Sequence, residues 1–449
     1  MNRRELIAGL AAVAAHSALP GEAQRLPASP PTSASLRVNP DRLRAHLEAL
    51  SVYGRPVGGT FADGVSRTAY SDADVAGRKY VLQLLRDAGL EPRIDPAGNI
   101  WARRDTPGAD RALQPIVFGS HIDSVRQGGN FDGDVGSLGA IEALQTLSEQ
   151  HVATRHPLEV VVWSAEESNY GSGLSGSRAA AGDVEPGEME RVQDGVRKAD
   201  AVRRIGGDPE RIAEARRAPG SFAAYLELHI EQGGTLDAGG IPIGVVEGIV
   251  GIDDYEVTIR GFANHAGTTP MPARQDALVA AAQLILAVRE IVTSQPGRQV
   301  GTVGEISVSP GAPNVIPGVV RHTIDVRDLD AAKLARLGEA IRARAQEIAQ
   351  RTGCEIEITK TGSHAPALTA PPIQAAIEHA ADGLSLRHTR LPSGAGHDAQ
   401  MMALLGPIGM IFVPSVAGIS HSPRELTRWQ DCANGANVLL QTVLEIDRT

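Results

Sequence analysis

Histidine and acidic residues follow directly after short apolar runs in this sequence, and IVFGSHIDSVRQGGNFDGDVG at residues 116–136 shows the pattern best. The apolar run there ends at Gly119, and a glycine-rich stretch then offers His121, Asp123 and Asp132. An imidazole and carboxylates presented just after a buried strand suit a divalent cation, and Asp123 is placed to orient the ring of His121. Taken alone, an HxD motif also fits a plain turn.

Three further apolar runs lead to potential metal ligands in the same way. In an open α/β sheet the carboxyl ends of the strands form one ligand crevice, so residues far apart in sequence can meet there. We therefore expect the residues after all four runs to share one site. The three further runs are LEVVVW at 158–163 before Glu166 and Glu167, AYLEL at 224–228 before His229, and MIFV at 410–413 before His421.

The composition is that of a globular protein large enough for two domains. The chain has 449 residues, of which 42% are hydrophobic and 21% charged. Its net charge of −10 gives no basic surface for nucleic acid or anionic lipid. No apolar run is long enough to span a bilayer. The expected partners are therefore a small-molecule substrate and a second copy of the chain.

The first residues have the pattern of an export signal. Arg3 and Arg4 precede an apolar run from Leu6 to Ala15, and a stretch rich in Pro, Ser and Ala follows as far as Ser35. Adjacent arginines before such a run are similar to a twin-arginine signal. We predict a signal and linker over residues 1–35 and a periplasmic location. A disordered basic tail on a cytoplasmic protein is the alternative.

The two cysteines, Cys354 and Cys432, fall in different predicted domains and belong to no CxxC motif. They therefore predict neither a disulfide framework nor a metal site, and buried free thiols are expected.

Residues 252–360 form a unit of their own in the hydrophobic pattern. Alternating and helical spacings follow one another there in the order β-α-β-β-α-β, which is typical of a ferredoxin-like fold. The predicted fold class is α/β, with a catalytic metal-binding domain at 36–251 and 361–449 that carries this unit as an insertion. Residues 175–220 look like exposed helices on a solvated surface, and a long helix from Leu426 closes the chain.

Taken together, the motifs resemble the M20 metallopeptidase-like family. Within it they are similar to the branch of N-carbamoyl-L-amino-acid hydrolases, allantoate amidohydrolases and β-ureidopropionases. The motifs that carry the resemblance, in family order, are GSHIDSV, FDG, AEES, ELHIEQG, NHAGTTPM, PNVIPG, SGAGHDA and ISHSPRE.

The resemblance implies a centre of two divalent metal ions, bridged by Asp132. Zn²⁺ is the expected metal, and Mn²⁺, Co²⁺ or Ni²⁺ are compatible with the same ligands. Glu166 would act as general base and acid beside the metals. The histidine at position 229, in place of a carboxylate, points to the carbamoylase-like branch. The implied ligands are His121, Asp132 and His229 for one ion and Asp132, Glu167 and His421 for the other.

The resemblance also implies how the substrate is held. His265 would stabilise the oxyanion, and the inserted domain would act as a lid and join a homodimer in which each site receives His265 from the partner subunit. Asn314 and Arg327 would hold the substrate carboxylate, although an arginine at a strand end also fits a solvated charge. Gln232 and His397 match further substrate contacts.

The implied reaction is cleavage of the ureido C–N bond of an N-carbamoyl-L-amino acid to the amino acid, CO₂ and NH₃. Allantoate amidohydrolase and β-ureidopropionase activities are the nearest alternatives, and an M20 peptidase or a non-catalytic periplasmic binding protein are more distant ones. Ser168, Asn169 and Tyr170 stand where relatives usually have Gly and an Arg-Phe-like pair. This departure leaves the exact substrate open.

Overall fold

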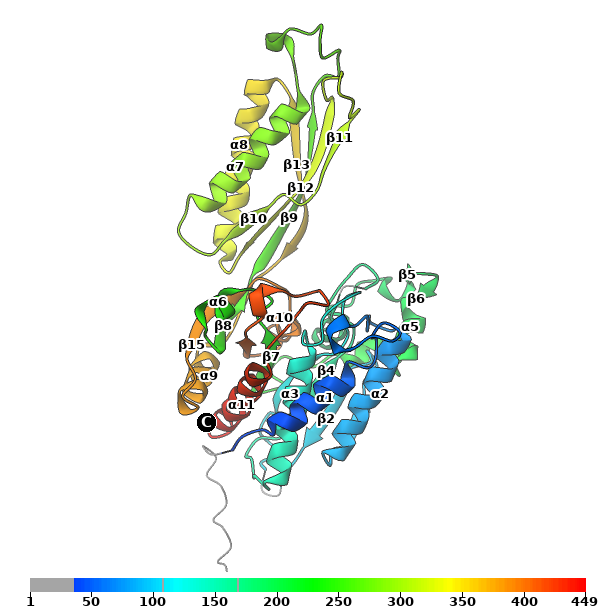
Figure 1. The fold of residues 1–449 in the computed structure, drawn as a ribbon, viewed down its shortest axis with the longest axis vertical. Helices are drawn as coiled ribbons and strands as arrows, with labels where there is room; N and C mark the ends of the chain where they lie inside the picture. Colours follow the sequence, from blue (N-terminus) through cyan, green and yellow to red (C-terminus); the bar gives the residue numbers. More distant parts are fainter. Residues whose placement is uncertain (1–35, 107–108, 168) are drawn as a thin grey trace, which may run out of the picture.

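The computed structural model describes residues 36–106, 109–167 and 169–449, which form a larger and a smaller unit (Figure 1). The larger unit is built on a mixed sheet in the order β1-β2-β4-β3-β7-β16-β8-β14, with β15 paired to β8. Its strands are β1 (Pro92–Ile94), β2 (Ile100–Arg104), β3 (Ile116–His121), β4 (Leu158–Trp163), β7 (Ala224–Ile230), β8 (Ile243–Ile249), β14 (Ala367–Leu368), β15 (His388–Ser393) and β16 (Ile408–Val413).

Helices cover both faces of this sheet, which is why its central strands read as continuous apolar runs. Successive side chains of β3 alternate between two hydrophobic clusters: Ile116 and Phe118 pack with α1, α2, α3, α9 and α11, and Val117 packs with α4, α6 and α10. The helices of this unit are α1 (Pro40–Leu50), α2 (Asp72–Asp87), α3 (Asp134–Glu149), α4 (Ser175–Ala181), α5 (Lys198–Arg204), α6 (Thr235–Gly239), α9 (Pro371–Gly383), α10 (Asp398–Met402) and α11 (Trp429–Ile446).

Local signals in the sequence set several helix boundaries. The side chain of Asn39 accepts the backbone N–H groups of Asp41 and Arg42, and Pro40 occupies the first helical position of α1, as predicted. Helix α3 begins at Asp134, so the predicted bridging residue Asp132 lies just before its N-terminus. The last helix begins at Trp429 and not at the predicted Leu426, because residues 425–428 are not helical and Arg428, directly before the helix, has an extended backbone.

The four strands that the sequence singled out lie side by side. Strand β3 pairs in parallel with β4 on one side and with β7 on the other, and β7 pairs in parallel with β16. Their carboxyl ends therefore meet at one edge of the sheet, which confirms the expectation from the sequence.

The smaller unit has the predicted order of elements and stands apart from the larger sheet (Figure 1). Its strands form a sheet in the order β10-β12-β9-β13, with β11 also paired to β12. Both of its helices pack with the sheet in one hydrophobic cluster. The elements are β9 (Gly251–Arg260), α7 (Ala277–Thr293), β10 (Val300–Thr302), β11 (Ile306–Ser309), β12 (Val319–Asp328), α8 (Ala331–Thr352) and β13 (Glu355–His364).

Two details of this unit differ from the expectation. The single strand expected at residues 303–308 is split into β10 and β11, which pair with different parts of β12. Strand β13 runs as far as His364, because its pairing with β9 continues past a bulge between Lys360 and Gly362.

The segment 175–220 was predicted as exposed helices on a solvated surface, and this is wrong in part. It contains only the short helices α4 and α5, with 3₁₀ turns η3 (Glu188–Glu190) and η4 (Pro209–Ala215) and a hairpin of β5 (Val192–Gln193) and β6 (Val196–Arg197). Lys198 is 1% exposed and forms an ion pair of 2.5 Å with the buried carboxylate of Glu188. Some of the charges that suggested a solvated surface are therefore buried and paired, whereas pairs such as Arg203–Asp200 are exposed as expected. The other 3₁₀ turns are η2 (Phe61–Asp63), η5 (Met271–Ala273) and η6 (Val416–Gly418).

Cys354 and Cys432 are both free and buried, and they lie in the smaller and the larger unit respectively, as expected. Within the described part of the chain, no helix has the length and apolar character that a membrane crossing requires. The predicted export signal at residues 1–35 lies outside the described residues and stays a prediction.

Candidate metal centre

The predicted ligands come together at the carboxyl edge of the parallel strands. His121 is the last residue of β3, His229 lies near the end of β7, and Glu167 follows β4 after a short turn. They fall into two groups, and within each group the possible ligand atoms all lie within 4.8 Å of one another. One group is His121, Asp132 and His229, and the other is Asp132, Glu167 and His421.

The carboxylate of Asp132 belongs to both groups, and each of its oxygens faces a different one. Its Oδ1 lies 3.1 Å from Nε2 of His229 and 3.5 Å from Nε2 of His121. Its Oδ2 lies 3.4 Å from Nε2 of His421, which in turn lies 3.4 Å from Oε1 of Glu167. A carboxylate in this position can bridge two cations.

The backbone sets the orientation of the two buried histidines. Nδ1 of His121 lies 2.9 Å from the carbonyl oxygen of Asp123, and Nδ1 of His229 lies 3.0 Å from that of Ile230. A carbonyl only accepts, so in both rings Nδ1 carries a proton and Nε2 is the nitrogen that faces Asp132. When the ring is neutral, Nε2 holds the lone pair that can bind a metal.

The side chain of Asp123 has a different role from the predicted one. Its backbone carbonyl, and not its carboxylate, orients the ring of His121, because the carboxylate Oδ1 lies 3.9 Å from Nδ1. The two carboxylate oxygens instead accept the backbone N–H groups of Glu166 and Glu167, at 3.2 and 3.1 Å. The preceding residue, Ala165, has a left-handed φ of 51°, a strained conformation that these hydrogen bonds help to hold.

Several carboxylates lie close together in this buried site, and burial raises the pKa values of two of them. Burial raises the pKa of Glu166 well above its usual value, with a further contribution from the charge of Glu167 against the opposing effect of His121. Burial also raises the pKa of Glu167 to about 7. Two divalent cations would supply the positive charge that these groups require, so the donor set fits a two-metal centre.

Glu166 itself belongs to neither group of possible ligands. Its Oε2 lies 3.7 Å from Nε2 of His121, at the inner end of the site. A buried carboxyl group with a raised pKa beside a metal centre is typical of a residue that exchanges protons during a reaction.

A cavity of about 200 Å³ lies over this centre, and two of the four predicted substrate residues line it. Gln232 donates from Nε2 to Oδ2 of Asp132 at 2.7 Å and has a left-handed φ of 57°. His397 is buried, and Ser393 Oγ lies 2.8 Å from its Nε2. Burial, together with the charge of His229, holds the pKa of His397 well below its usual value, so its ring is neutral.

Arg327 lies near the junction between the two units. Its guanidinium binds the carboxylate of Asp325 and donates from Nη1 to the carbonyl oxygen of Gly394 at 2.7 Å. Gly394 precedes Ala395, Gly396 and His397, which line the cavity over the metal centre. Arg327 is thus tied to a loop of the site, and it is not a freely solvated charge.

His265 and Asn314 lie far from this centre. His265 lies in the loop after β9, and Asn314 lies in the loop before β12. Both loops are at the end of the smaller unit away from the junction, and the ten-residue strand β9 puts about 30 Å between the two ends. His265 is exposed, and its Nδ1 accepts the backbone N–H groups of Gly267 and Thr268. The proton of this ring therefore sits on Nε2, from which it can be donated to another molecule.

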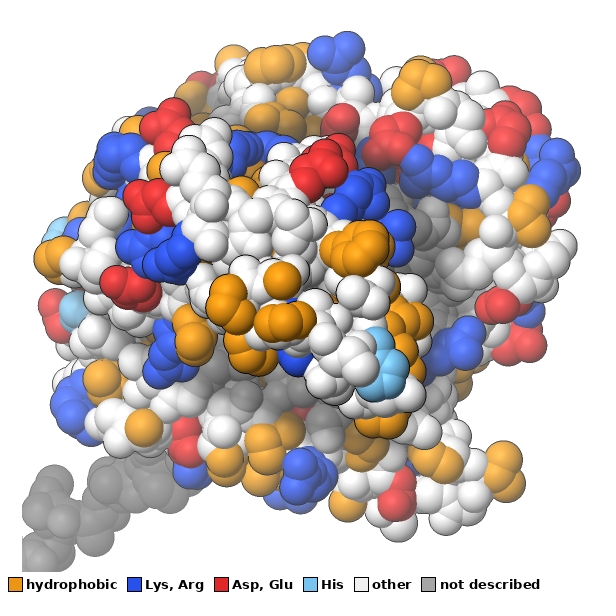
Figure 2. All heavy atoms as spheres, turned by 90° about the horizontal axis from the view of Figure 1, so that it is seen from above, with side chains coloured by type: hydrophobic (Ala, Val, Ile, Leu, Met, Phe, Trp, Pro, Cys, Tyr) orange, Lys and Arg blue, Asp and Glu red, His pale blue; other side chains and the backbone are white. Residues whose placement is uncertain are grey.

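The surface around His265 is partly apolar. The side chains of Phe262 and Met271 are 63% and 72% exposed. Seen from above, this end of the molecule shows groups of hydrophobic side chains between charged ones (Figure 2). Such a surface is typical of one that meets another protein chain.

Two further carboxylates support the centre, and the sequence reasoning missed both. Oε1 of Glu425 accepts the backbone N–H groups of Phe131 and Asp132, at 3.0 and 3.1 Å. Glu227 is fully buried in β7, where it accepts from Ser120 Oγ and from the backbone N–H of Ala399, both at 2.8 Å. A glutamate inside the apolar run AYLEL was the signal that could have indicated Glu227.

Comparison with known proteins agrees with this geometry. Residues 117–445 match the pattern of peptidase family M20/M25/M40. The chain is 40% identical over 408 residues to an N-carbamoyl-L-amino acid amidohydrolase of Geobacillus stearothermophilus, covering 90% of this chain and 98% of that protein. It is 34% identical to the allantoate amidohydrolase of Escherichia coli, covering 84% and 92%. A solved hydantoinase/carbamoylase family amidase from Burkholderia multivorans superposes with a TM-score of 0.83 at 36% identity, covering 92% and 99%.

Proposed function

Because this chain belongs to peptidase family M20/M25/M40 and is a hydrolase of carbon–nitrogen bonds other than peptide bonds, we propose that it cleaves N-carbamoyl-L-amino acids. One water and one substrate molecule give the amino acid, CO₂ and NH₃. The observation that carries the proposal is the placement of Asp132 between two groups of ligands, one of which contains His229. Identities of 36–40% to several N-carbamoyl-L-amino-acid amidohydrolases support the choice of substrate.

Two divalent cations would be held by the two groups of residues that share Asp132. When bound, they would polarise the ureido carbonyl and make water more acidic. Imidazole and carboxylate ligands suit Zn²⁺ and also Mn²⁺, Co²⁺ or Ni²⁺.

Glu166 moves the proton in this mechanism. It takes a proton from the attacking water while the water oxygen forms a bond to the ureido carbon. It then gives the proton to the nitrogen of the amino acid as the C–N bond breaks, and the carbamate that is left decomposes to CO₂ and NH₃. The hydrogen bonds from the backbone of Glu166 and Glu167 to Asp123 fix the turn and so keep the base beside the metal ligands.

The substrate is held from two sides. Gln232 and His397 are placed to contact the ureido group, because they line the cavity over the metal centre. Arg327 is placed beside this cavity through its contact with Gly394, and a guanidinium there can bind the carboxylate of the amino acid.

His265 and Asn314 act in the partner subunit of a homodimer. Their distance from the metal centre of their own chain, and the exposed Nε2–H of His265 on a partly apolar surface, support donation to a second copy. There the imidazole would stabilise the oxyanion of the tetrahedral intermediate. The smaller unit thus serves as lid and dimerisation domain.

A substrate panel tests the proposed reaction. The purified chain, loaded in turn with Zn²⁺, Mn²⁺, Co²⁺ and Ni²⁺, is assayed for ammonia release from N-carbamoyl-L-amino acids, allantoate, ureidoglycolate, 3-ureidopropionate and a dipeptide. N-carbamoyl-L-amino acids should give the highest kcat/KM. A higher kcat/KM for another compound of the panel would refute the proposed substrate class. Tight binding of the compounds without turnover of any would indicate a binding protein.

Mixed dimers test the role of His265. His265→Ala and Glu166→Gln are co-expressed with different tags, and the doubly tagged dimer is purified. With donation between subunits, one of its two sites carries both changes and the other carries neither, so the purified mixed dimer should have about half of the parent's activity. The random mixture before purification, in which about half of the dimers are mixed, should have about a quarter. With donation inside each subunit, every site keeps one change, and verified mixed dimers would be as inactive as either parent variant.

A further inference from the structure

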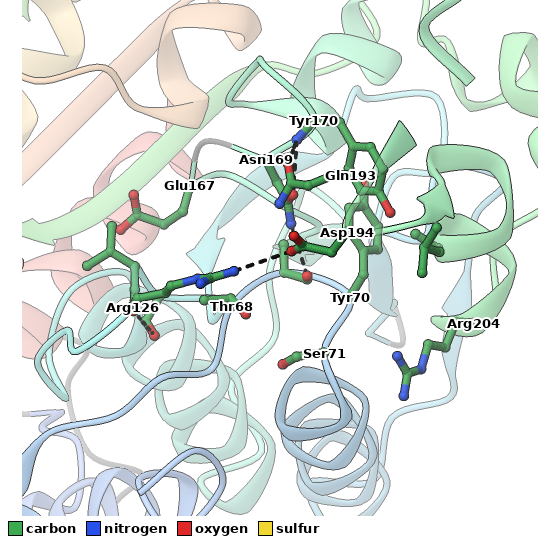
Figure 3. Close-up of a pocket in the computed structure, with 15 residues that line it drawn as sticks. Thr68, Tyr70, Ser71, Arg126, Glu167, Asn169, Tyr170, Gln193, Asp194 and Arg204 are labelled. Atoms are coloured by element: carbon green, nitrogen blue, oxygen red, sulfur yellow. Dashed lines mark hydrogen bonds and ion pairs between the residues drawn. The ribbon is translucent and has the colours of Figure 1, made fainter. Parts of the chain in front are cut away.

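A second cavity, of about 380 Å³, lies beside the metal centre, and the mechanism above does not use it. Glu167 lines this cavity and also the cavity over the metals. Figure 3 shows Glu167 on one side of it, with Tyr70, Tyr170, Asn169 and the hairpin residue Gln193 on the other. A molecule bound at the metals could therefore extend directly into this space.

The far wall of the cavity is built before any substrate arrives. Tyr70 and Tyr170 are mostly buried, and their rings meet edge to face with centroids 5.9 Å apart. Asn169 donates to the carbonyl oxygen of Ala69 at 3.0 Å, and the backbone N–H of Tyr170 donates to Oε1 of Gln193 at 2.7 Å. The wall is thus held in one shape, as a binding pocket requires.

The base of the hairpin is fixed in the same way. Lys198, which directly follows β6, donates to Ser175 Oγ at 2.8 Å and pairs with Glu188, and all three side chains are buried. This buried ion pair holds the hairpin against α4.

Two guanidinium groups, of Arg126 and Arg204, and two carboxylates, of Glu167 and Asp194, line the cavity. Figure 3 shows the side chain of Arg126 reaching across the cavity toward Asp194, at 3.4 Å, and Arg204 at the opposite side. Arg126 and Asp194 are 78% and 77% exposed, and an ion pair so exposed contributes little, so Arg126 can exchange it for another carboxylate. The methylene groups of a bound side chain would lie against the tyrosine wall.

We propose, building on the reaction proposed above, that this cavity receives the side chain of the N-carbamoyl-L-amino acid and selects one that ends in a carboxylate, which Arg126 binds. Arg204, which pairs with Asp72, is a second cation at the opposite side of the cavity. Asp194 competes for Arg126 and so limits the preference.

The test compares two substrates with the same number of side-chain carbons, N-carbamoyl-L-glutamate, which ends in a carboxylate, and N-carbamoyl-L-norvaline, which ends in a methyl group, by the ratio of their kcat/KM values. The ratio should favour glutamate in the parent protein. Arg126→Gln should lower the ratio about tenfold, because it removes a charge-assisted hydrogen bond, and Arg126→Lys should restore part of it. Arg204→Gln should lower the ratio less, and Asp194→Asn should raise it. Arg86→Gln is the matched control. Arg86 is an exposed arginine on α2 that does not line the cavity, so this variant should leave the ratio unchanged.

The outcomes separate this inference from the reaction on which it rests. Two results would overturn the assignment of the cavity and leave the reaction standing. One is a kcat/KM for N-carbamoyl-L-norvaline equal to or above that for N-carbamoyl-L-glutamate, and the other is a ratio of the two values that neither arginine variant changes. Absence of turnover for every N-carbamoyl-L-amino acid overturns both.

Discussion

Replacing Gly133 by alanine tests the geometry of the metal centre most directly, because this glycine lies against the ring of His121. Gly133 has a left-handed φ of 66°. A Cβ atom added there would lie 2.4 Å from Cε1 and 2.5 Å from Nδ1 and Nε2 of His121. Non-bonded atoms of this kind are in favourable contact at about 3.5 Å or more, so the ring must move by about 1 Å.

The size of the effect follows from this displacement. Metal–ligand distances tolerate about 0.2 Å, so a shift of about 1 Å removes His121 from the coordination sphere. Disturbing a group that orients a ligand already costs about 10- to 100-fold in metal affinity. We therefore expect Gly133→Ala to lose affinity at one of the two metal sites by about 100-fold or more. The left-handed backbone adds a loss of stability of about 1–2 kcal/mol.

Gly89→Ala is the matched control. Gly89 has a left-handed φ of 78°, and nothing lies within 4 Å of an added Cβ, so this variant carries the backbone strain without the clash. Urea unfolding should show a loss of stability in both variants, with a larger loss in Gly133→Ala because the clash adds to the backbone strain. Metal content after dialysis and calorimetric titration should show the loss of metal only in Gly133→Ala. Two metals bound there with the affinity of the parent would refute the placement of His121 as a ligand.

Three further predictions concern catalysis, stability and export. Glu166→Gln should keep both metals and lower kcat by about 10²–10⁴, measured as metal content beside turnover, and near-normal turnover would exclude Glu166 as the base. Burial raises the pKa of Asp74 to about 6, compared with about 3.9 in the unfolded chain. The protonated carboxyl group favours the folded state, so its contribution to the free energy of unfolding is complete below about pH 4 and is lost as the pH rises through 6. Asp74→Asn, which can still accept the N–H of Tyr70, should therefore gain about 2–3 kcal/mol over the parent between pH 4 and pH 7 in urea unfolding, and parallel pH profiles would contradict this. Residues 1–35 fused to a reporter should direct it to the periplasm and should fail to do so with Arg3→Lys and Arg4→Lys; equal export of the double variant would rule out a twin-arginine signal.

The sequence alone determined the framework of this protein. Apolar runs such as LEVVVW carry the pattern of strands buried on both faces, and a histidine or carboxylate at the end of each run is a local feature. Since parallel strands end at one edge of a sheet, His121, Asp132, Glu167, His229 and His421 could be placed together without coordinates. The alternating and helical spacings of residues 252–360 likewise predicted the order of elements in the smaller unit.

The tertiary structure alone decided the contacts that loops make, because loops have no periodicity to read. Only the path of the chain after Ala165 shows that the carboxylate of Asp123 holds the turn of Glu166 and Glu167 and that its backbone carbonyl orients His121. The burial of Lys198 was hidden for a related reason. The sequence of a charged run does not show which of its charges will be buried, and only the fold brings Glu188, ten residues earlier, against Lys198 in the interior.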